Sequence, residues 1–344
     1  MRLTRLVPAP LRRRLRAVLP AKPRTPPAPL HVIATRHGIG VFDEQWFAYR
    51  QLMLEHLPLA SLDAQTCRDF TWVITVDRDM PPVARRRLDE LAAPRPYIRI
   101  TETELKRDFV PDLVQWVREE ARARGKRWVL TTRLDDDDAV DRGLVARLHQ
   151  ESAAYLAEGP KAAAVLSPTL GCNWVPSKAA GHRAYHHSPS IGLSLLEKAS
   201  GATTVYRGNH RTLAQGLAQW GVNVRHLDGQ TMWWLYAHTG LSHMQSEGSD
   251  RMDKVAGHRN GFALDAEALA RFGVTPEGAR LLRETPEPER RESLHQLNNR
   301  GHELEGEIVA LRERIGEADA GEEVRERIAA LHAERRRMHE RLVR

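Results

Sequence analysis

Four consecutive aspartates follow a hydrophobic segment at residues 128–134 and form what we call the acidic cluster: Asp135, Asp136, Asp137 and Asp138. Adjacent anions repel one another, and carboxylate oxygens are preferred ligands of hard divalent cations. Because side chains alternate between the two faces of an extended chain, we expect Asp135 and Asp137 on one side and the other two on the opposite side. Either pair could bind one Mg²⁺ or Mn²⁺. Turn formation and helix capping are the alternative explanation, but neither uses all four carboxylates.

Alternating strands and helices are expected to position this cluster. The sequence predicts strands at residues 31–35, 70–76, 97–100 and 128–134, and helices at residues 43–56, 82–91, 111–123 and 142–156. This alternation favours an α/β fold with a mostly parallel sheet flanked by helices. Ligands of such sheets bind beyond the carboxyl ends of the strands, where Arg36, Asp77 and the acidic cluster all fall.

Loops that bind phosphate through glycines are missing from the sequence. It contains neither Gly-x-Gly-x-x-Gly nor Gly-Lys-Ser/Thr, which argues against a Rossmann dinucleotide site and a P-loop. A nucleotide diphosphate bound here would therefore need a cation, which we expect the acidic cluster to hold.

The positive charge of the chain is concentrated at its beginning. The formal net charge is +7 over 344 residues, but residues 1–24 carry eight arginines and lysines and no acid. The rest of the chain is therefore close to neutral, so we expect no nucleic-acid partner. Residues 1–29 form a basic arm and proline-rich linker. The arm could contact a membrane as a short amphipathic helix, act as an organelle presequence, or remain a solvated tail.

The number of cysteines and the lack of long apolar runs indicate the cellular location that we expect for the protein. Two cysteines are too few for a disulfide framework and suit a reducing cytosol. No apolar run approaches the roughly 20 residues of a membrane-spanning helix. We therefore expect a cytoplasmic protein that could lie peripherally at the inner face of the plasma membrane.

The last part of the chain, residues 286–344, is highly charged and has leucines at heptad spacing, at Leu297, Leu304 and Leu311. The apolar period breaks at residues 316–321 and then resumes, which indicates two helices folded as a hairpin or one kinked coil. We expect a coiled-coil contact, which could join copies of the chain, and a solvated helical tail is the alternative. Residues 30–285 would then form the main domain.

Residues 165–246 are rich in glycine, histidine and large aromatic residues. Aromatic side chains commonly stack on sugars, so this region could form an acceptor pocket, although large aromatics more often belong to a core. The candidates are Trp174, Tyr185, Tyr206, Trp220, Trp233 and Trp234.

Several of these motifs resemble a known family. The segment from Ser61 through Gln65 and Thr66 to the strand ending at Asp77 is similar to the opening of GT-A glycosyltransferases. Residues 132–139, Thr-Arg-Leu-Asp-Asp-Asp-Asp-Ala, resemble the Arg-Leu-Asp-x-Asp-Asp signature of the rhamnosyltransferase family within that fold. Residues 192–195, 208–210 and 232–238 resemble further parts of its pattern. The likeness covers roughly residues 31–250.

The resemblance implies a metal-dependent glycosyltransferase that moves a sugar, rhamnose by the family's name, from a nucleoside diphosphate to a hydroxyl acceptor. It implies donor contacts at Thr35, Arg36, Asp77, Arg133, Asp135 and Asp136. It implies metal ligation by Asp135, Asp137 and His238, with His243 as the alternative to His238. Family members usually lack an acid at the middle position, so Asp136 opens a second register. We prefer Asp135 and Asp137, because Asp138 then remains free to cap the next helix.

Transfer to a hydroxyl also needs a base, for which we consider Glu197 and Asp228. We expect the acceptor to be a cell-envelope glycan or glycolipid. Two other readings of the sequence stay open: a metal-dependent phosphotransferase or phosphohydrolase, and a non-enzymatic scaffold built on the basic arm and the C-terminal helices.

Overall fold

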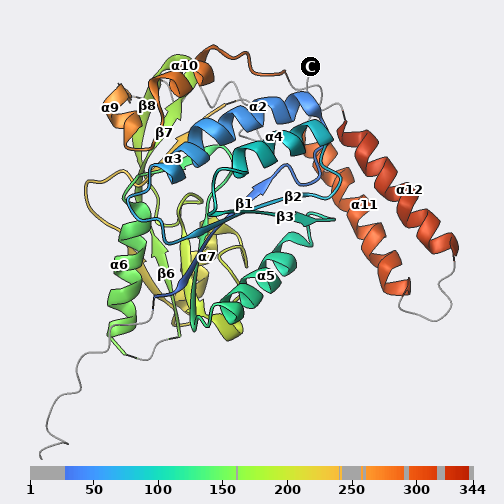
Figure 1. Cartoon of the computed structure of the whole chain (residues 1–344), viewed down its shortest axis with the longest axis horizontal. Coiled ribbons are helices and arrows are strands. Elements are labelled where there is room, and N and C mark those ends of the chain that lie inside the picture. Colours follow the sequence, from blue (N-terminus) through green and yellow to red (C-terminus); the bar gives the residue numbers. More distant parts are fainter. Residues whose placement is uncertain are drawn as a thin grey trace, which may run out of the picture.

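The computed structural model describes residues 28–159, 162–239, 241, 257–258, 261–289, 294–315 and 322–340. The basic arm and the break in the heptad pattern at residues 316–321 thus lie almost wholly outside the described residues. Figure 1 shows a twisted sheet with helices on both faces and a pair of C-terminal helices beside one edge.

The main sheet has seven strands in the order β10-β6-β9-β4-β1-β2-β3. All are parallel except β9, which runs antiparallel to β4 and β6. The strands span Leu30–His37 (β1), Thr71–Asp77 (β2), Ile98–Thr103 (β3), Trp128–Arg133 (β4), Ala163–Ser167 (β6), Ser194–Lys198 (β9) and Asn223–His226 (β10). The α/β fold class predicted from the sequence is confirmed.

A second sheet of five strands is connected to the first through the acidic cluster. Its order is β12-β8-β7-β11-β5. The strands span Asp138–Val140 (β5), Leu170–Val175 (β7), Ala180–Tyr185 (β8), Trp234–Ala237 (β11) and Gly261–Ala263 (β12). Because β5 begins at Asp138 and β4 ends at Arg133, the chain passes from one sheet to the other within the acidic cluster.

Helices cover the two faces of the main sheet. The larger apolar core packs α2 (Glu44–Leu54), a π-helical turn (Glu55–Leu59), α3 (Ala60–Asp63), α4 (Pro82–Ala92) and α6 (Leu144–Ala157) against one face. The other core packs α5 (Phe109–Ala123) and α7 (His210–Gln219) against the opposite face. Alternate residues of β1 show the division, since Ile33 belongs to the first core and Val32 and Ala34 to the second. A strand buried on both sides is expected in a parallel sheet.

The predicted elements of the first half agree with the structure to within a few residues. Aspartate caps α2, because the Asp43 carboxylate accepts a hydrogen bond of 2.9 Å from the Trp46 amide. Proline begins α4 at Pro82, where its missing N–H costs no helical bond. Two short helices, α9 (Ala266–Ala270) and α10 (Pro276–Glu284), follow β12.

The C-terminal helices α11 (Leu294–Ile315) and α12 (Glu322–His339) lie along one another at the β3 side of the sheet (Figure 1). Leu304, Ile308 and Leu331 from these helices bury a small apolar cluster around Leu105, which follows β3. The pair, which we call the C-terminal helix pair, therefore packs on the main domain. Its role in joining copies of the chain stays a prediction.

None of the helices described is both long enough and apolar enough to cross a bilayer.

Candidate functional site

The acidic cluster turns between the two sheets instead of continuing as a strand. Asp136 and Asp137 form a turn between β4 and β5, and both carboxylates reach the same guanidinium. Arg50, on α2, donates from Nη1 to Asp137 Oδ2 over 2.8 Å and from Nη2 to Asp136 Oδ1. The second oxygen of Asp136 lies 2.6 Å from Nδ1 of His37, at the end of β1. The expected alternation of faces is therefore wrong, because it assumed an extended backbone.

Asp138 does not cap the next helix. It lies in β5, opposite Tyr236 of β11, and the cap residue of α6 is Gly143. The Oδ1 atom of Asp138 is buried without a hydrogen-bond partner among the described residues. Burial and the neighbouring Asp137 raise the pKa of Asp138 well above its ordinary value. The argument for assigning the metal to Asp135 and Asp137 on the ground that Asp138 caps the helix is thus wrong.

Burial and ion pairing act in opposite directions on the other three carboxyls. Burial would raise the pKa of Asp136, but Arg50 and His37 outweigh it and hold that pKa at about 2. Burial raises the pKa of Asp137 to about 6, even though Arg50 opposes the shift. Burial also opposes ionisation of Asp135, where Arg133 and Arg36 lower the pKa below its ordinary value. Asp135, Asp136 and Asp137 are thus each paired with an arginine of the protein itself.

Arg36 and Arg133 flank Asp135 at the carboxyl ends of β1 and β4. Nη2 of Arg133 donates to Asp135 Oδ2 over 2.9 Å. The guanidinium carbons of Arg133 and Arg36 lie 5.1 Å and 5.5 Å from the ring centre of Tyr206. A hydrogen bond helps to fix that ring, because its hydroxyl donates to the carbonyl of Ala34 over 2.9 Å. Asp135 is the most exposed of the three paired carboxylates, with 26% of its side chain accessible.

Two further basic groups lie within electrostatic range of this pair. Burial and then the charge of Arg36 lower the pKa of Lys106. Burial and then the charge of Arg133 lower the pKa of His210 to about 4. Burial is the larger cause of both shifts, and the smaller contributions place Lys106 near Arg36 and His210 near Arg133.

Asp77, at the end of β2, is paired with the C-terminal helix pair. Its Oδ2 atom lies 2.6 Å from Nη2 of Arg335 on α12 and accepts the Gly40 amide at 3.0 Å. Arg335 also donates to the carbonyl of Glu104 over 3.0 Å. Asp77 is 1% exposed and Arg335 is 2% exposed. A donor could touch the Asp77 side chain only after Arg335 moved.

Thr35 has a packing role in this arrangement. Its hydroxyl donates to the carbonyl of Leu134 over 2.6 Å and accepts from the indole N–H of Trp72 over 2.8 Å. The residue is fully buried. It fixes the chain that leads into the acidic cluster and does not face a ligand.

The three predicted metal ligands each have another partner. Asp137 is paired with Arg50 and Asp135 with Arg133, while Nε2 of the buried His238 lies 2.9 Å from Oδ1 of Asn173. Across the described part of the chain, no three His, Cys, Asp or Glu side chains gather as a group that could hold a metal ion. These contacts do not fit a divalent ion shared by the three residues.

The two predicted bases lie away from the cluster. Glu197 is paired in register with Val129, near the start of β4, whereas the cluster follows the end of that strand. Its carboxylate accepts bonds from both the amide and the hydroxyl of Thr203 and from the amide of Thr204. Asp228 follows β10 at the same edge as the cluster, three strand spacings or about 14 Å from β4. Only Asp228 is thus at the end of the sheet where ligands are expected.

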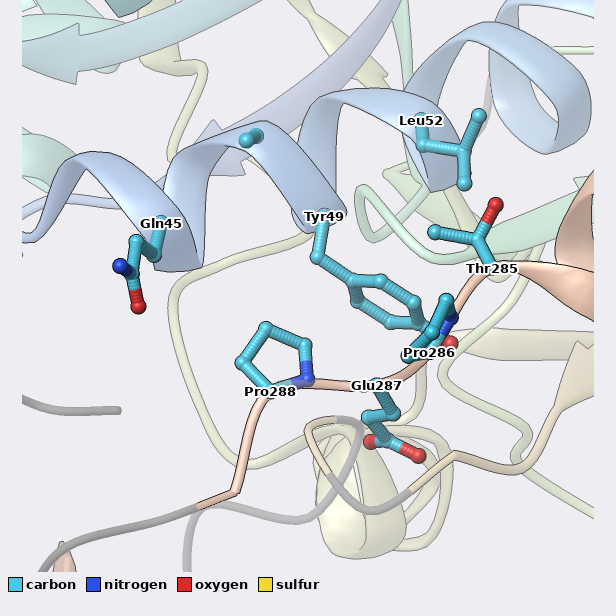
Figure 2. Close-up of a pocket in the computed structure, with 8 residues that line it drawn as sticks. Gln45, Tyr49, Leu52, Thr285, Pro286, Glu287 and Pro288 are labelled. Carbon is cyan, nitrogen blue, oxygen red and sulfur yellow. The ribbon is translucent and has the colours of Figure 1, made fainter. Parts of the chain in front are cut away.

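A cavity of about 240 Å³ lies beside α2, with Tyr49, His238 and Glu287 among its lining residues. A neighbouring pocket of about 450 Å³ shares Tyr49 and Glu287. Figure 2 shows the Tyr49 ring extending from α2 toward residues 285–288. Burial and then the charge of Glu287 raise the pKa of Tyr49. The cavity thus adjoins Tyr49, which precedes Arg50 on α2.

Sequence reasoning missed Arg50, Lys106 and Arg335, whose partners lie far away along the chain. Arg50 carried one signal, since apolar residues such as Trp46 and Leu54 lie one turn away from it on either side of the expected helix, and an arginine in an apolar setting needs an acidic partner. Nothing in the sequence pattern placed Arg335 beside Asp77.

The mostly parallel sheet carries acidic and basic side chains at its carboxyl edge, in the α/β architecture that the sequence predicted. Residues 30–233 match the model of the family described as "Putative rhamnosyl transferase". This match covers more than half of the chain, which therefore belongs to that family, and the predicted glycosyltransferase class is confirmed.

Other comparisons were less informative. No curated protein matches the chain. A cytidylyltransferase from Leptospira borgpetersenii serovar Hardjo-bovis is 12% identical, with a TM-score of 0.32 and coverage of 59% of this chain and 76% of that one. Residues 1–349 of S. aureus TarS are 10% identical, with a TM-score of 0.33 and coverage of 90% and 88%. Likenesses this weak support no conclusion about the chain.

Proposed function

We propose that this glycosyltransferase binds a nucleoside-diphosphate sugar at the carboxyl ends of β1 and β4 and transfers its sugar, rhamnose by family, to a hydroxyl acceptor. The proposal is carried by one observation: Arg36 and Arg133 lie over the same Tyr206 ring beside the partly exposed Asp135. Guanidinium groups are well suited to bind diphosphate oxygens. A carboxylate beside them can accept hydrogen bonds from ribose or sugar hydroxyls.

The chemistry follows from where charge develops. As the bond between the sugar and the diphosphate breaks, negative charge accumulates on the departing phosphate. Fixed cations placed at that point stabilise the transition state more than the ground state. Arg36 and Arg133 would supply this charge, with Lys106 nearby. The acceptor hydroxyl must also lose its proton, and Asp228 stays the predicted base because it lies at the same edge of the sheet.

The acceptor would be a cell-envelope glycan or glycolipid, reached by a protein working at the inner face of the membrane. Among the described residues, no observation specifically favours the phosphotransferase or the scaffold alternative.

The test is donor binding and turnover by the full chain. The purified protein would be titrated calorimetrically with UDP, GDP and dTDP, and incubated with the corresponding rhamnose and hexose donors while released diphosphate is measured. We expect one nucleotide to bind, and R133M to weaken that binding by about tenfold or more, equal to about 1.4 kcal/mol. R87M is the matched control, because Arg87 pairs at the surface with Glu55 of the π-helical turn and Glu90 of α4, away from the proposed site. If no nucleotide binds, or if both variants bind like the wild type, the proposed donor site is wrong.

A further inference from the structure

Arg50 takes up a position between two carboxylates that a cation would otherwise occupy. Its two terminal nitrogens are divided between Asp136 and Asp137, and the side chain is 8% exposed. Its guanidinium carbon lies 5.5 Å from the ring centre of Trp46, one turn earlier on α2. These contacts orient the planar guanidinium toward the turn between β4 and β5.

The same contacts act against a second cation at this point. A divalent ion bound to Asp136 and Asp137 would have to share their oxygens with a guanidinium or displace it. Two like charges a few ångströms apart in a buried site repel strongly. Displacement would in turn leave Arg50 buried without a partner, because its Nε atom already has none among the described residues.

We propose that Arg50 is the resident cation of the acidic cluster: by bridging Asp136 and Asp137 it holds the turn that presents Asp135, and donor binding then requires no divalent metal. This inference rests on the proposed donor site. Arg50 is a positioning residue, since it acts through the two aspartates and does not face the donor. Arg36 and Arg133 then stabilise the negative charge on the departing diphosphate. Both lie on the side of β1 and β4 that carries Tyr206.

The first experiment needs no nucleotide, so it is independent of the proposed function. Mn²⁺ would be titrated into metal-free full-length protein and its free fraction followed by electron paramagnetic resonance. We expect no saturable binding by the wild type. R50M should bind one Mn²⁺ per chain, because the two carboxylates lose their cation. R50K should remain like the wild type, since it keeps a positive charge, and R87M is the control for losing a surface arginine.

A structural role alone would not give R50M a new metal site, which makes this readout specific. Saturable Mn²⁺ binding by the wild type overturns the proposal. So does a folded R50M that binds no Mn²⁺. Circular dichroism will show whether R50M folds. If it does not, the wild type and R50K test the proposal instead. Saturable Mn²⁺ binding by these two proteins would show that the cluster accepts a metal while a cation occupies position 50.

The second experiment measures whether the donor needs a metal. Wild-type protein treated with EDTA and then freed of it would be titrated with UDP, GDP and dTDP, with and without Mn²⁺. We expect the same dissociation constant within about threefold, or less than about 1 kcal/mol. Tightening by tenfold or more with Mn²⁺ overturns the proposal and leaves the donor site standing. Failure of every nucleotide to bind counts against the donor site, while the Mn²⁺ titration still decides the role of Arg50.

Discussion

The Arg335 guanidinium lies 2.6 Å from the Asp77 carboxylate, which joins residues 258 positions apart in the chain. Both side chains are almost fully buried. The guanidinium carbon also lies 5.3 Å from the ring centre of Phe42. The last helix of the chain therefore reaches the end of β2, next to the proposed donor site, and is part of the same packed structure. From the sequence we expected a coiled-coil contact or a solvated helical tail, and neither expectation placed Arg335 beside Asp77.

We predict that R335M lowers the free energy of unfolding by about 3–5 kcal/mol, because it leaves the buried Asp77 carboxylate without its cation. R336M is the matched control. Arg336 is its neighbour on α12, pairs with Asp79 in an exposed position, and should contribute less than about 1 kcal/mol. Urea denaturation of the three proteins measures the difference. Equal stability of the two variants would show that the buried pair contributes little.

The Tyr206 ring beneath the two arginines gives a second prediction. Y206F removes only the hydrogen bond to Ala34, so we expect a loss of about 0.5–1.5 kcal/mol in stability and little change in nucleotide affinity. Y206A removes the surface on which both guanidinium groups lie, and we expect affinity to fall by about tenfold. Calorimetric titration with the nucleotide that binds the wild type distinguishes the two. Comparable affinity in both variants would mean that the ring does not organise the arginines.

Local patterns predicted the strands and helices of the first half well. The expected strand at residues 31–35 is β1, and the expected helix at residues 82–91 is α4. Periodicity and turn residues act over a few positions, so they report elements reliably. They also placed Arg36 and the acidic cluster at the carboxyl edge of the sheet.

The partners of the charged residues could not be predicted in the same way. Arg50 is separated from Asp136 by 86 positions and Arg335 from Asp77 by 258, so their pairing depends on the complete fold. The predicted alternation of the aspartate side chains between two faces was wrong for a related reason. The chain leaves the first sheet at these aspartates to enter the second, and the pairing of β5 with β11 is a tertiary event.

Glu197 should act in folding and not in proton transfer. E197Q weakens the acceptance of hydrogen bonds from Thr203 and Thr204, so we expect a loss of about 1–3 kcal/mol in stability with kcat unchanged. D228N should lower kcat by about 10²–10⁴ if Asp228 takes the acceptor proton. Turnover and denaturation curves of the two variants measure both effects. A large fall in kcat for a folded E197Q would restore Glu197 as the base.

Acidification should destabilise the fold through His31. Its ring is buried, with Nδ1 3.0 Å from Nε2 of His149 and Nε2 2.8 Å from the hydroxyl of Thr132. Burial, followed by the nearby His149, lowers the pKa of His31 well below 6.5. Below pH 6.5 the unfolded chain therefore binds a proton that the folded chain resists. Stability from this residue is complete above pH 6.5 and is lost as the pH falls below it.

Other groups contribute to the same pH profile. Asp69 and Lys126 act on His149, whose own pKa is lowered by burial. The raised pKa values of Asp77 and Asp137 act in the opposite sense, because protonating these carboxyls in acid favours the folded state. The contribution of His31 is therefore isolated by comparing the wild type with H31Q, which keeps every other group. We expect urea denaturation to show a steeper loss of stability between pH 7 and pH 5 in the wild type. Parallel profiles would mean that His31 is not held neutral in the folded protein.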